Sequence, residues 1–217
     1  DLPNNIQSKV RLFADDTALY RDIRSVSDCA TLNNDLLELE KWEHEWQMQF
    51  NVDKCNVLSV SNKRNPIKFD YKLHEQKLKE VNSAKYLGVE ISKTLKWTTH
   101  IEQTTKKANK TSAFLTRNLK GCPVSTQIHA YKSAVRPILE YASNIWDPHQ
   151  QNEIDSLEKI QRRAARRITK SFSRRTSVTT LVESLSLEPL EKRRKKSKVV
   201  KFHQIYHGKS CLKIPES

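Results

Sequence analysis

The spacing of apolar residues changes near residue 95, and this change limits the folds open to the chain. Before it, apolar residues come in short runs that often alternate with polar ones, which is typical of β-strands. After Trp97 they recur at steps of three and four residues, which is typical of amphipathic helices. The sequence therefore predicts an α+β protein. We expect a small antiparallel sheet with a packed helix in residues 1–94, and a basic all-helical bundle in residues 95–217.

The first region is predicted to begin with a β-hairpin over residues 10–20, with Asp15 and Asp16 at its turn. A helix follows, for which Ser27 is the expected N-cap and Asp28 an acidic residue of the first turn. Its apolar stripe, interpreted as core, consists of Leu32, Leu36, Leu39, Trp42, Trp46 and Phe50. Further short strands are expected within residues 51–62, 69–73 and 85–91.

Four longer helical segments are predicted in the second region. Gly121 and Pro123 should end the first of them, and Pro137 should kink or break the second. The third carries the basic run "QRRAARR" at 161–167, and the last, from about Glu188 to Tyr206, carries "KRRKKSK".

Charge is distributed unevenly between the two ends of the chain. Residues 1–60 hold 6 Lys and Arg against 11 Asp and Glu, whereas residues 61–217 hold 33 against 14. A sustained excess of positive charge favours a polyanionic partner, because neutralised phosphates release their condensed counterions. The alternative is an ordinary solvated surface.

Other classes of protein are disfavoured by composition. The four cysteines, Cys29, Cys55, Cys122 and Cys211, lack the spacing of a zinc site, and they fit a reducing compartment better than a disulfide scaffold. No apolar run approaches the roughly 20 residues of a membrane span. Because the chain begins at Asp1 and its single methionine is Met48, we expect a fragment or a copy without its start.

Adjacent carboxylates at a hairpin tip suggest a metal site. Two such groups repel each other unless a cation lies between them, and Mg²⁺ prefers oxygen ligands. In two-metal phosphoryl transfer the ions activate a hydroxyl and stabilise the leaving oxygen. The alternative is an ordinary turn, in which aspartate is common.

Six segments extend this interpretation along almost the whole chain. They are "FADD" (13–16), "FNVDKCNVLSVS" (50–61), "KYLGVEIS" (85–92), "LKWTTHIEQTTKKANK" (95–110), "YKSAVRPILEYASNIWDP" (131–148) and "LEKIQRRAARRIT" (157–169). In these segments and their order the chain resembles the C-terminal part of the reverse transcriptase of non-LTR retrotransposons, of the jockey and CR1 type.

The resemblance implies a partial palm in residues 1–94 and a thumb in residues 95–217 of an RNA-directed DNA polymerase. Asp15 and Asp16 would be the catalytic metal ligands, Asp15 above all. Lys54 would lie in the segment that supplies a general acid to the leaving pyrophosphate, unless it is only a solvated lysine. Leu87 and Gly88 would form the primer-grip turn, unless they form a simple bulge.

Two basic clusters are candidate contacts to nucleic acid. The first lies on one face of the third helix and consists of Arg162, Arg163, Arg166 and Arg167. The second consists of Arg193, Arg194, Lys195 and Lys196, and its alternatives are a nuclear-localisation run or a solvated surface.

The partners implied by the resemblance are an RNA template, a DNA primer or target, deoxynucleotides and two Mg²⁺ ions. In the family the palm also needs an aspartate from an earlier strand and fingers residues that bind the incoming nucleotide, and an endonuclease domain usually precedes the polymerase; we identify none of these motifs in the sequence. We therefore predict that the chain alone does not polymerise. The alternative is a non-catalytic RNA- or DNA-binding protein from a decayed or co-opted element. Nucleus and cytoplasm both fit the family, and no membrane is implied.

Overall fold

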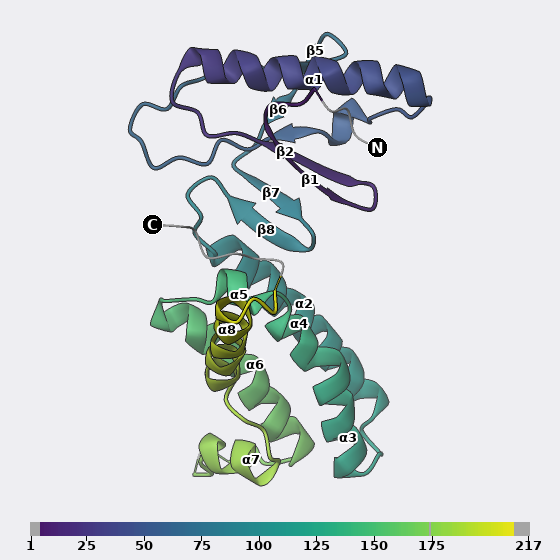
Figure 1. The fold of residues 1–217 in the computed structure, drawn as a ribbon. Helices are drawn as coiled ribbons and strands as arrows, with labels where there is room; N and C mark the ends of the chain where they lie inside the picture. Colours follow the sequence, from purple (N-terminus) through teal and green to yellow (C-terminus); the bar gives the residue numbers. More distant parts are fainter. Residues whose placement is uncertain (1–4, 174, 211–217) are drawn as a thin grey trace. The chain divides into compact units, whose positions relative to one another are not determined.

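The computed structural model describes residues 5–173 and 175–210 and divides the chain into two compact units, Asp1–Lys96 and Trp97–Ser217 (Figure 1). The division lies two residues after the boundary that the apolar spacing predicts. Cys211, one of the cysteines considered above, lies outside the described residues. Within the described part, no helix is long and apolar enough to cross a membrane.

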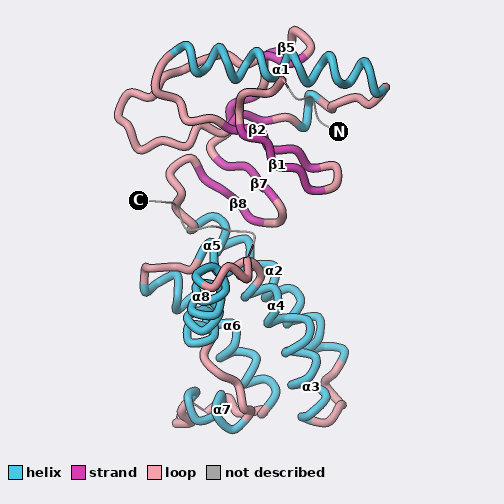
Figure 2. Tube along the Cα trace, viewed as in Figure 1, coloured by secondary structure: helices cyan, strands magenta, loops and turns pink. Residues whose placement is uncertain are grey.

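The strands of the first unit form four separate two-stranded sheets rather than one sheet (Figure 2). Three pairs are antiparallel and one is parallel, and the strands are only two to five residues long. The antiparallel pairs are β1 (Lys9–Phe13) with β2 (Asp16–Tyr20), β4 (Lys72–Leu73) with β5 (Gln76–Lys77), and β7 (Ser83–Tyr86) with β8 (Val89–Ser92). The parallel pair is β3 (Asn56–Val57) with β6 (Lys79–Glu80).

The long α-helix of this unit, α1 (Val26–Trp46), begins earlier than the sequence predicts. Its N-cap is Ser25 and not Ser27, because the Asp28 carboxylate lies three residues beyond Ser25 and closes a capping box with it. The backbone N–H and the hydroxyl of Ser25 both donate to Asp28, at 3.0 and 2.9 Å. The hydrogen bond from the backbone N–H of Arg24, together with the two bonds from Ser25, lowers the pKa of Asp28.

One side of α1 packs on the short strands. Cys29 lies in a buried cluster with Tyr71, Leu73 and Leu78, and Leu32 and Leu36 pack against it. The expected stripe is only partly core: Trp46 is exposed, whereas Phe50 packs against the buried cluster from beyond the helix end. The apolar spacing therefore continues to Phe50, whereas α1 ends at Trp46.

Eight helical elements make up the second unit within the described residues. They are α2 (Thr98–Asn118), α3 (Val124–Ala130), the π-helical turn η2 (Tyr131–Val135), α4 (Arg136–Glu140), α5 (Ser143–Trp146), α6 (Gln151–Ile168), α7 (Val178–Ser184) and α8 (Leu190–Tyr206). Their buried side chains include Ile101, Ala108, Val135, Leu139, Trp146, Leu157, Ile160, Ala164 and Leu190.

The break expected at Pro137 is present and has a specific form. The helix widens into η2, in which the Arg136 N–H donates to the Tyr131 carbonyl, and Pro137 follows as an early residue of α4. A proline has no N–H and clashes with a preceding helical carbonyl, so a π-turn just before it accommodates both effects. The chain then turns at Ala142, whose φ is 53°.

Candidate metal and nucleic-acid site

Asp15 and Asp16 lie at the tip of the β1–β2 hairpin. Phe13 pairs with Asp16, so Ala14 and Asp15 form a two-residue turn. Ala14 has a φ of 53°, a value that a residue with a Cβ adopts at a cost. Both aspartates are exposed. The hairpin therefore presents two adjacent carboxylates to solvent on a tight, strained turn.

The apolar residues beside this tip are also exposed. Leu12 is 55% and Phe13 62% exposed, and Tyr20 at the other end of the hairpin is exposed as well. A two-stranded ribbon without a covered face is marginally stable on its own. Val10, Ala18 and Leu19 near the base of the hairpin are partly buried, so within the described residues it is the tip that is available for other chain segments or ligands.

Asp35 of α1 anchors the base of the hairpin. It is buried, and its two carboxylate oxygens accept the backbone N–H groups of Gln7 (2.9 Å) and Ser8 (2.8 Å), directly before β1. These charge-assisted bonds fix where the first strand begins relative to α1. Asp35 is not among the residues that the sequence predicts to be functional; its signal is a carboxylate on the apolar side of a helix, between Leu32 and Leu39.

The donor chemistry of the hairpin tip suits a hard divalent cation, which takes carboxylate oxygens. Among residues 5–173 and 175–210, no three His, Cys, Asp or Glu side chains form a group that could hold a metal ion. Asp15 and Asp16 can therefore supply two carboxylates of such a site, and further ligands would have to come from elsewhere.

The two other palm candidates lie on separate elements of the first unit. Lys54 ends the 3₁₀-helical turn η1 (Val52–Lys54) and is exposed. Leu87 and Gly88 form the two-residue turn between β7 and β8, with φ values of 45° and 80°. Both therefore adopt the left-handed conformation of a type I′ hairpin turn, and Tyr86 pairs with Val89 without a bulge.

Of the four arginines of α6, Arg162 and Arg163 lie on its exposed side, whereas Arg166 and Arg167 are half-buried. Arg162 and Arg163 are exposed, and Arg162 lies 4.0 Å from the Asp155 carboxylate, which is itself exposed. The guanidinium group of Arg166 already donates hydrogen bonds to the Ser171 and Ser173 carbonyls, at 3.4 and 3.1 Å.

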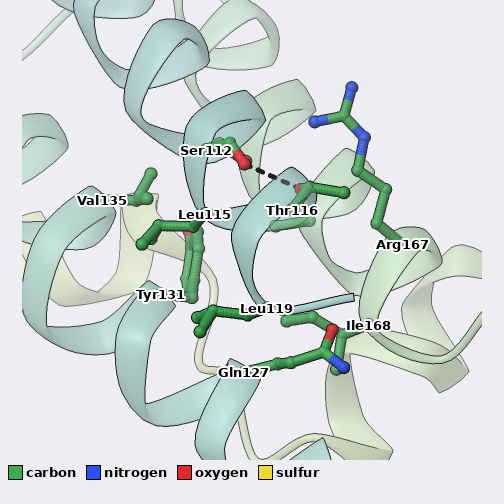
Figure 3. Close-up of a pocket in the computed structure, with 10 residues that line it drawn as sticks. Ser112, Leu115, Thr116, Leu119, Gln127, Tyr131, Val135, Arg167 and Ile168 are labelled. Atoms are coloured by element: carbon green, nitrogen blue, oxygen red, sulfur yellow. Dashed lines mark hydrogen bonds between the residues drawn. The ribbon is translucent and has the colours of Figure 1, made fainter. Parts of the chain in front are cut away.

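Arg167 lies at the edge of a small cavity lined mainly by α2, α3, η2 and α6 (Figure 3). In Figure 3 its guanidinium extends away from Leu119 and Gln127. The cavity of about 20 Å³ has room for roughly one water molecule. It cannot hold a nucleotide, so the basic side of α6 and not this cavity is the candidate site.

The second basic cluster needs a correction. Arg194 is only 1% exposed, and its Nε donates to Asp147 at 2.8 Å, so it cannot contact an external phosphate. Arg193 forms a forked pair with Glu140, and this bond raises the pKa of Arg193. We therefore remove both arginines from the predicted nucleic-acid contacts and assign them to the packing of α8.

The lysines of that cluster remain exposed but carry local partners. Lys195 lies 2.6 Å from Glu191 and Lys196 lies 2.6 Å from Glu188. Such exposed pairs are weak and can exchange for a phosphate.

The comparisons with known proteins agree with the resemblance. The chain is 26% identical over 167 residues to the "Probable RNA-directed DNA polymerase from transposon X-element" of Drosophila melanogaster, covering 75% of this chain and 18% of that protein. It is also 26% identical over 184 residues to the "Probable RNA-directed DNA polymerase from transposon BS" of the same organism, covering 82% and 20%. No family model and no solved structure matches.

These matches confirm that the chain contains a reverse transcriptase-like region, as the sequence predicts. The chain spans about a fifth of the length of the curated relatives it matches.

Proposed function

We propose, on the premise of this similarity, that the chain is one part of an RNA-directed DNA polymerase of a non-LTR element. The first unit would be the second half of the palm and the second unit its thumb. The observation that carries the proposal is the pair of exposed carboxylates at the hairpin tip, Asp15 in the two-residue turn and Asp16 at the start of β2, within the segment "FADD".

In this proposal Asp15 and Asp16 would hold Mg²⁺ against nucleotide phosphates. When bound, the ions would activate the primer hydroxyl and stabilise the leaving oxygen. The hairpin contributes rigidity, because Asp35 fixes its base and the Ala14 turn aims both carboxylates outward. A third carboxylate from an earlier palm strand would complete the set.

The neighbouring elements would position the substrates. The tight Leu87–Gly88 turn is short enough to approach the primer end closely. The exposed Lys54 would donate a proton to the departing pyrophosphate. Arg162 and Arg163, both exposed on α6, would contact phosphates of the template–primer duplex through their planar guanidinium groups.

A segment exchange tests the proposal. The matched region of the transposon X-element polymerase is replaced by this chain, and RNA-templated primer extension is measured with Mg²⁺ and deoxynucleotides. We expect DNA synthesis by the chimaera, and a loss of at least about 100-fold when Asp15 and Asp16 are both changed to Ala, since such ions contribute several kcal/mol. The matched control changes Asp22, an exposed aspartate just after β2, to Ala. Equal activity of the Asp15/Asp16 variant would contradict the proposal.

The second candidate function is non-catalytic binding of RNA or DNA. It is favoured by one observation, the exposed arginines of α6 in a region of net positive charge. A folded chimaera that binds the RNA–DNA hybrid as tightly as the parent but extends no primer would favour this function over catalysis.

A further inference from the structure

The second half of α8 presents an aromatic surface that the described chain leaves uncovered. The first half is held by buried Leu190 and Arg194, whereas Val199, Phe202 and Tyr206 follow at helical spacing on one face. Phe202 is 64% and Tyr206 67% exposed. Large apolar side chains gathered on an exposed surface mark an interaction site more often than single ones do.

The rings on this surface lie close to one another. Phe202 and Tyr206 are nearly parallel, with ring centroids 6.3 Å apart and planes at 25°. On the adjoining positions the His203 and His207 rings have centroids 4.2 Å apart. Four planar rings therefore lie within two turns of helix, and each can offer a face to another planar group.

Positive charge surrounds these rings. Residues 192–210 contain eight Lys and Arg and no Asp or Glu. Nearest to the rings in sequence are Lys201, whose Nζ lies 3.1 Å from the Ser210 hydroxyl, and Lys209, which is exposed. The acidic partners of this helix, Glu188, Glu191, Glu140 and Asp147, interact with Lys and Arg no later in the chain than Lys198.

We propose that the aromatic end of α8, residues 199–209, binds single-stranded RNA by stacking unpaired bases on Phe202 and Tyr206. The choice of RNA rests on the proposed function, in which the RNA template is single-stranded before it is copied. The surface itself supplies both features that sequence-tolerant single-strand binding requires, stacking rings and cations along the phosphates.

The alternatives fit the same surface less well. Duplex nucleic acid keeps its bases stacked inside, so it would use the cations and leave the rings exposed. A second copy of this chain would bring an equally positive α8 against this one, and like charges repel.

The test measures RNA binding by the full chain in EDTA without deoxynucleotides, so the metal site takes no part. The probe is a fluorescein-labelled 12-nucleotide RNA without secondary structure, used as a single strand and annealed to its complement. The variant is Phe202→Leu with Tyr206→Leu, which keeps the surface apolar and favours helix. The matched control is Phe114→Leu, an exposed phenylalanine of α2. Circular dichroism verifies that all variants remain helical.

We expect the double variant to bind the single strand about tenfold or more weakly and the duplex within twofold of the parent, with Phe114→Leu unchanged. Ultraviolet crosslinking of a 4-thiouridine RNA should place the adducts within residues 199–209. Unchanged single-strand affinity, an equal loss for the duplex, or tenfold tighter binding of the matching DNA would overturn the proposal. The proposal would also be overturned if the parent chain were a dimer and the double variant were a monomer with unchanged RNA affinity. The RNA-binding assay contains no metal and no nucleotide. Failure of RNA binding at α8 can therefore be distinguished from failure of the chimaera to extend a primer.

Discussion

At the scale of single residues, buried charged side chains contribute to the packing of this chain, and the spacing of apolar residues does not predict them. Asp35 and Arg194 both lie in the interior and both hold one element against another. A buried charge destabilises a fold unless it is paired or hydrogen-bonded. The stability of the elements around Asp35 and Arg194 therefore depends on the few groups that pair with these two side chains.

Asp35 provides a prediction at this scale. Changing it to Ala removes the acceptor for the Gln7 and Ser8 N–H groups, and we expect a destabilisation of about 1.5–3 kcal/mol, as for hydrogen bonds to charged groups. Hydrogen exchange should show faster exchange of these two amides and of β1. Asn34→Ala, at an exposed neighbouring position of α1, is the control. Protected Gln7 and Ser8 amides in the Asp35 variant would show that the anchor is elsewhere.

Single-residue roles could be predicted from sequence only where the partner is close in the chain. The position of Asp15 and Asp16 at a hairpin tip is such a case, because the turn and its two strands occupy only twelve residues. The N-cap was placed two residues late because Ser25 and Ser27 both have a serine's capping chemistry, and only Asp28 decides between them. Arg193 and Arg194 pair with residues 53 and 47 positions away in the chain. The sequence around these two arginines therefore cannot be distinguished from a basic run that is exposed to solvent.

At the scale of elements, α8 is attached to the bundle by ion pairs with α4 and with the residue after α5. Arg194 and Lys198 both lie 2.8 Å from Asp147, and Arg193 pairs with Glu140 of α4. Two terminal nitrogens of Arg194, Nη1 and Nη2, find no hydrogen-bond partner within the described residues. The attachment therefore depends strongly on Asp147.

Asp147→Asn should detach α8. The change leaves the Arg194 charge buried without a counter-charge, and we expect a loss of about 3–5 kcal/mol in the free energy of unfolding, measured by urea denaturation. The double variant with Arg194→Met should be more stable than Asp147→Asn alone, because it also removes the buried charge. Asp155→Asn, which breaks an exposed pair at 4.0 Å, should cost less than about 1 kcal/mol. Additive effects of the Asp147 and Arg194 changes would rule out this coupling.

The same pair gives a dependence on pH. Burial alone would raise the pKa of Asp147, but hydrogen bonds and attraction from Lys198 and Arg194 outweigh it and lower the pKa below its ordinary value of 3.8. A carboxyl with a lowered folded pKa stabilises the fold fully above its unfolded pKa and loses that contribution as the pH falls through the folded value. The stability difference between the parent and Asp147→Asn should therefore be constant near neutral pH and shrink below about pH 3.8.

Element types were easier to predict than their assembly. Long apolar repeats placed α2, α6 and α8 within a few residues of their observed ends, because a helix is determined by local periodicity. Strand pairing is not local, and strands of two residues such as β3 and β4 leave almost no periodic signal. The single expected sheet is accordingly replaced by four small ones.

At the scale of the whole molecule, the two units differ in charge as well as in architecture. Asp1–Lys96 holds 15 Lys and Arg against 15 Asp and Glu, whereas Trp97–Ser217 holds 24 against 10. The excess of positive charge that favours a polyanionic partner therefore lies in the helical unit. The proposed function requires a cation site in the first unit and a polyanion-binding surface in the second. It depends most on the claim that Asp15 and Asp16 hold the cations.

The most direct test of that claim is paramagnetic broadening of the backbone amide signals of the full chain by Mn²⁺. The account predicts selective broadening at residues 13–17 at substoichiometric Mn²⁺, competed by Mg²⁺ and abolished in Asp15→Asn/Asp16→Asn but retained in Asp22→Asn. Broadening that is strongest elsewhere, or that persists at the hairpin tip after both carboxylates are changed, would contradict it.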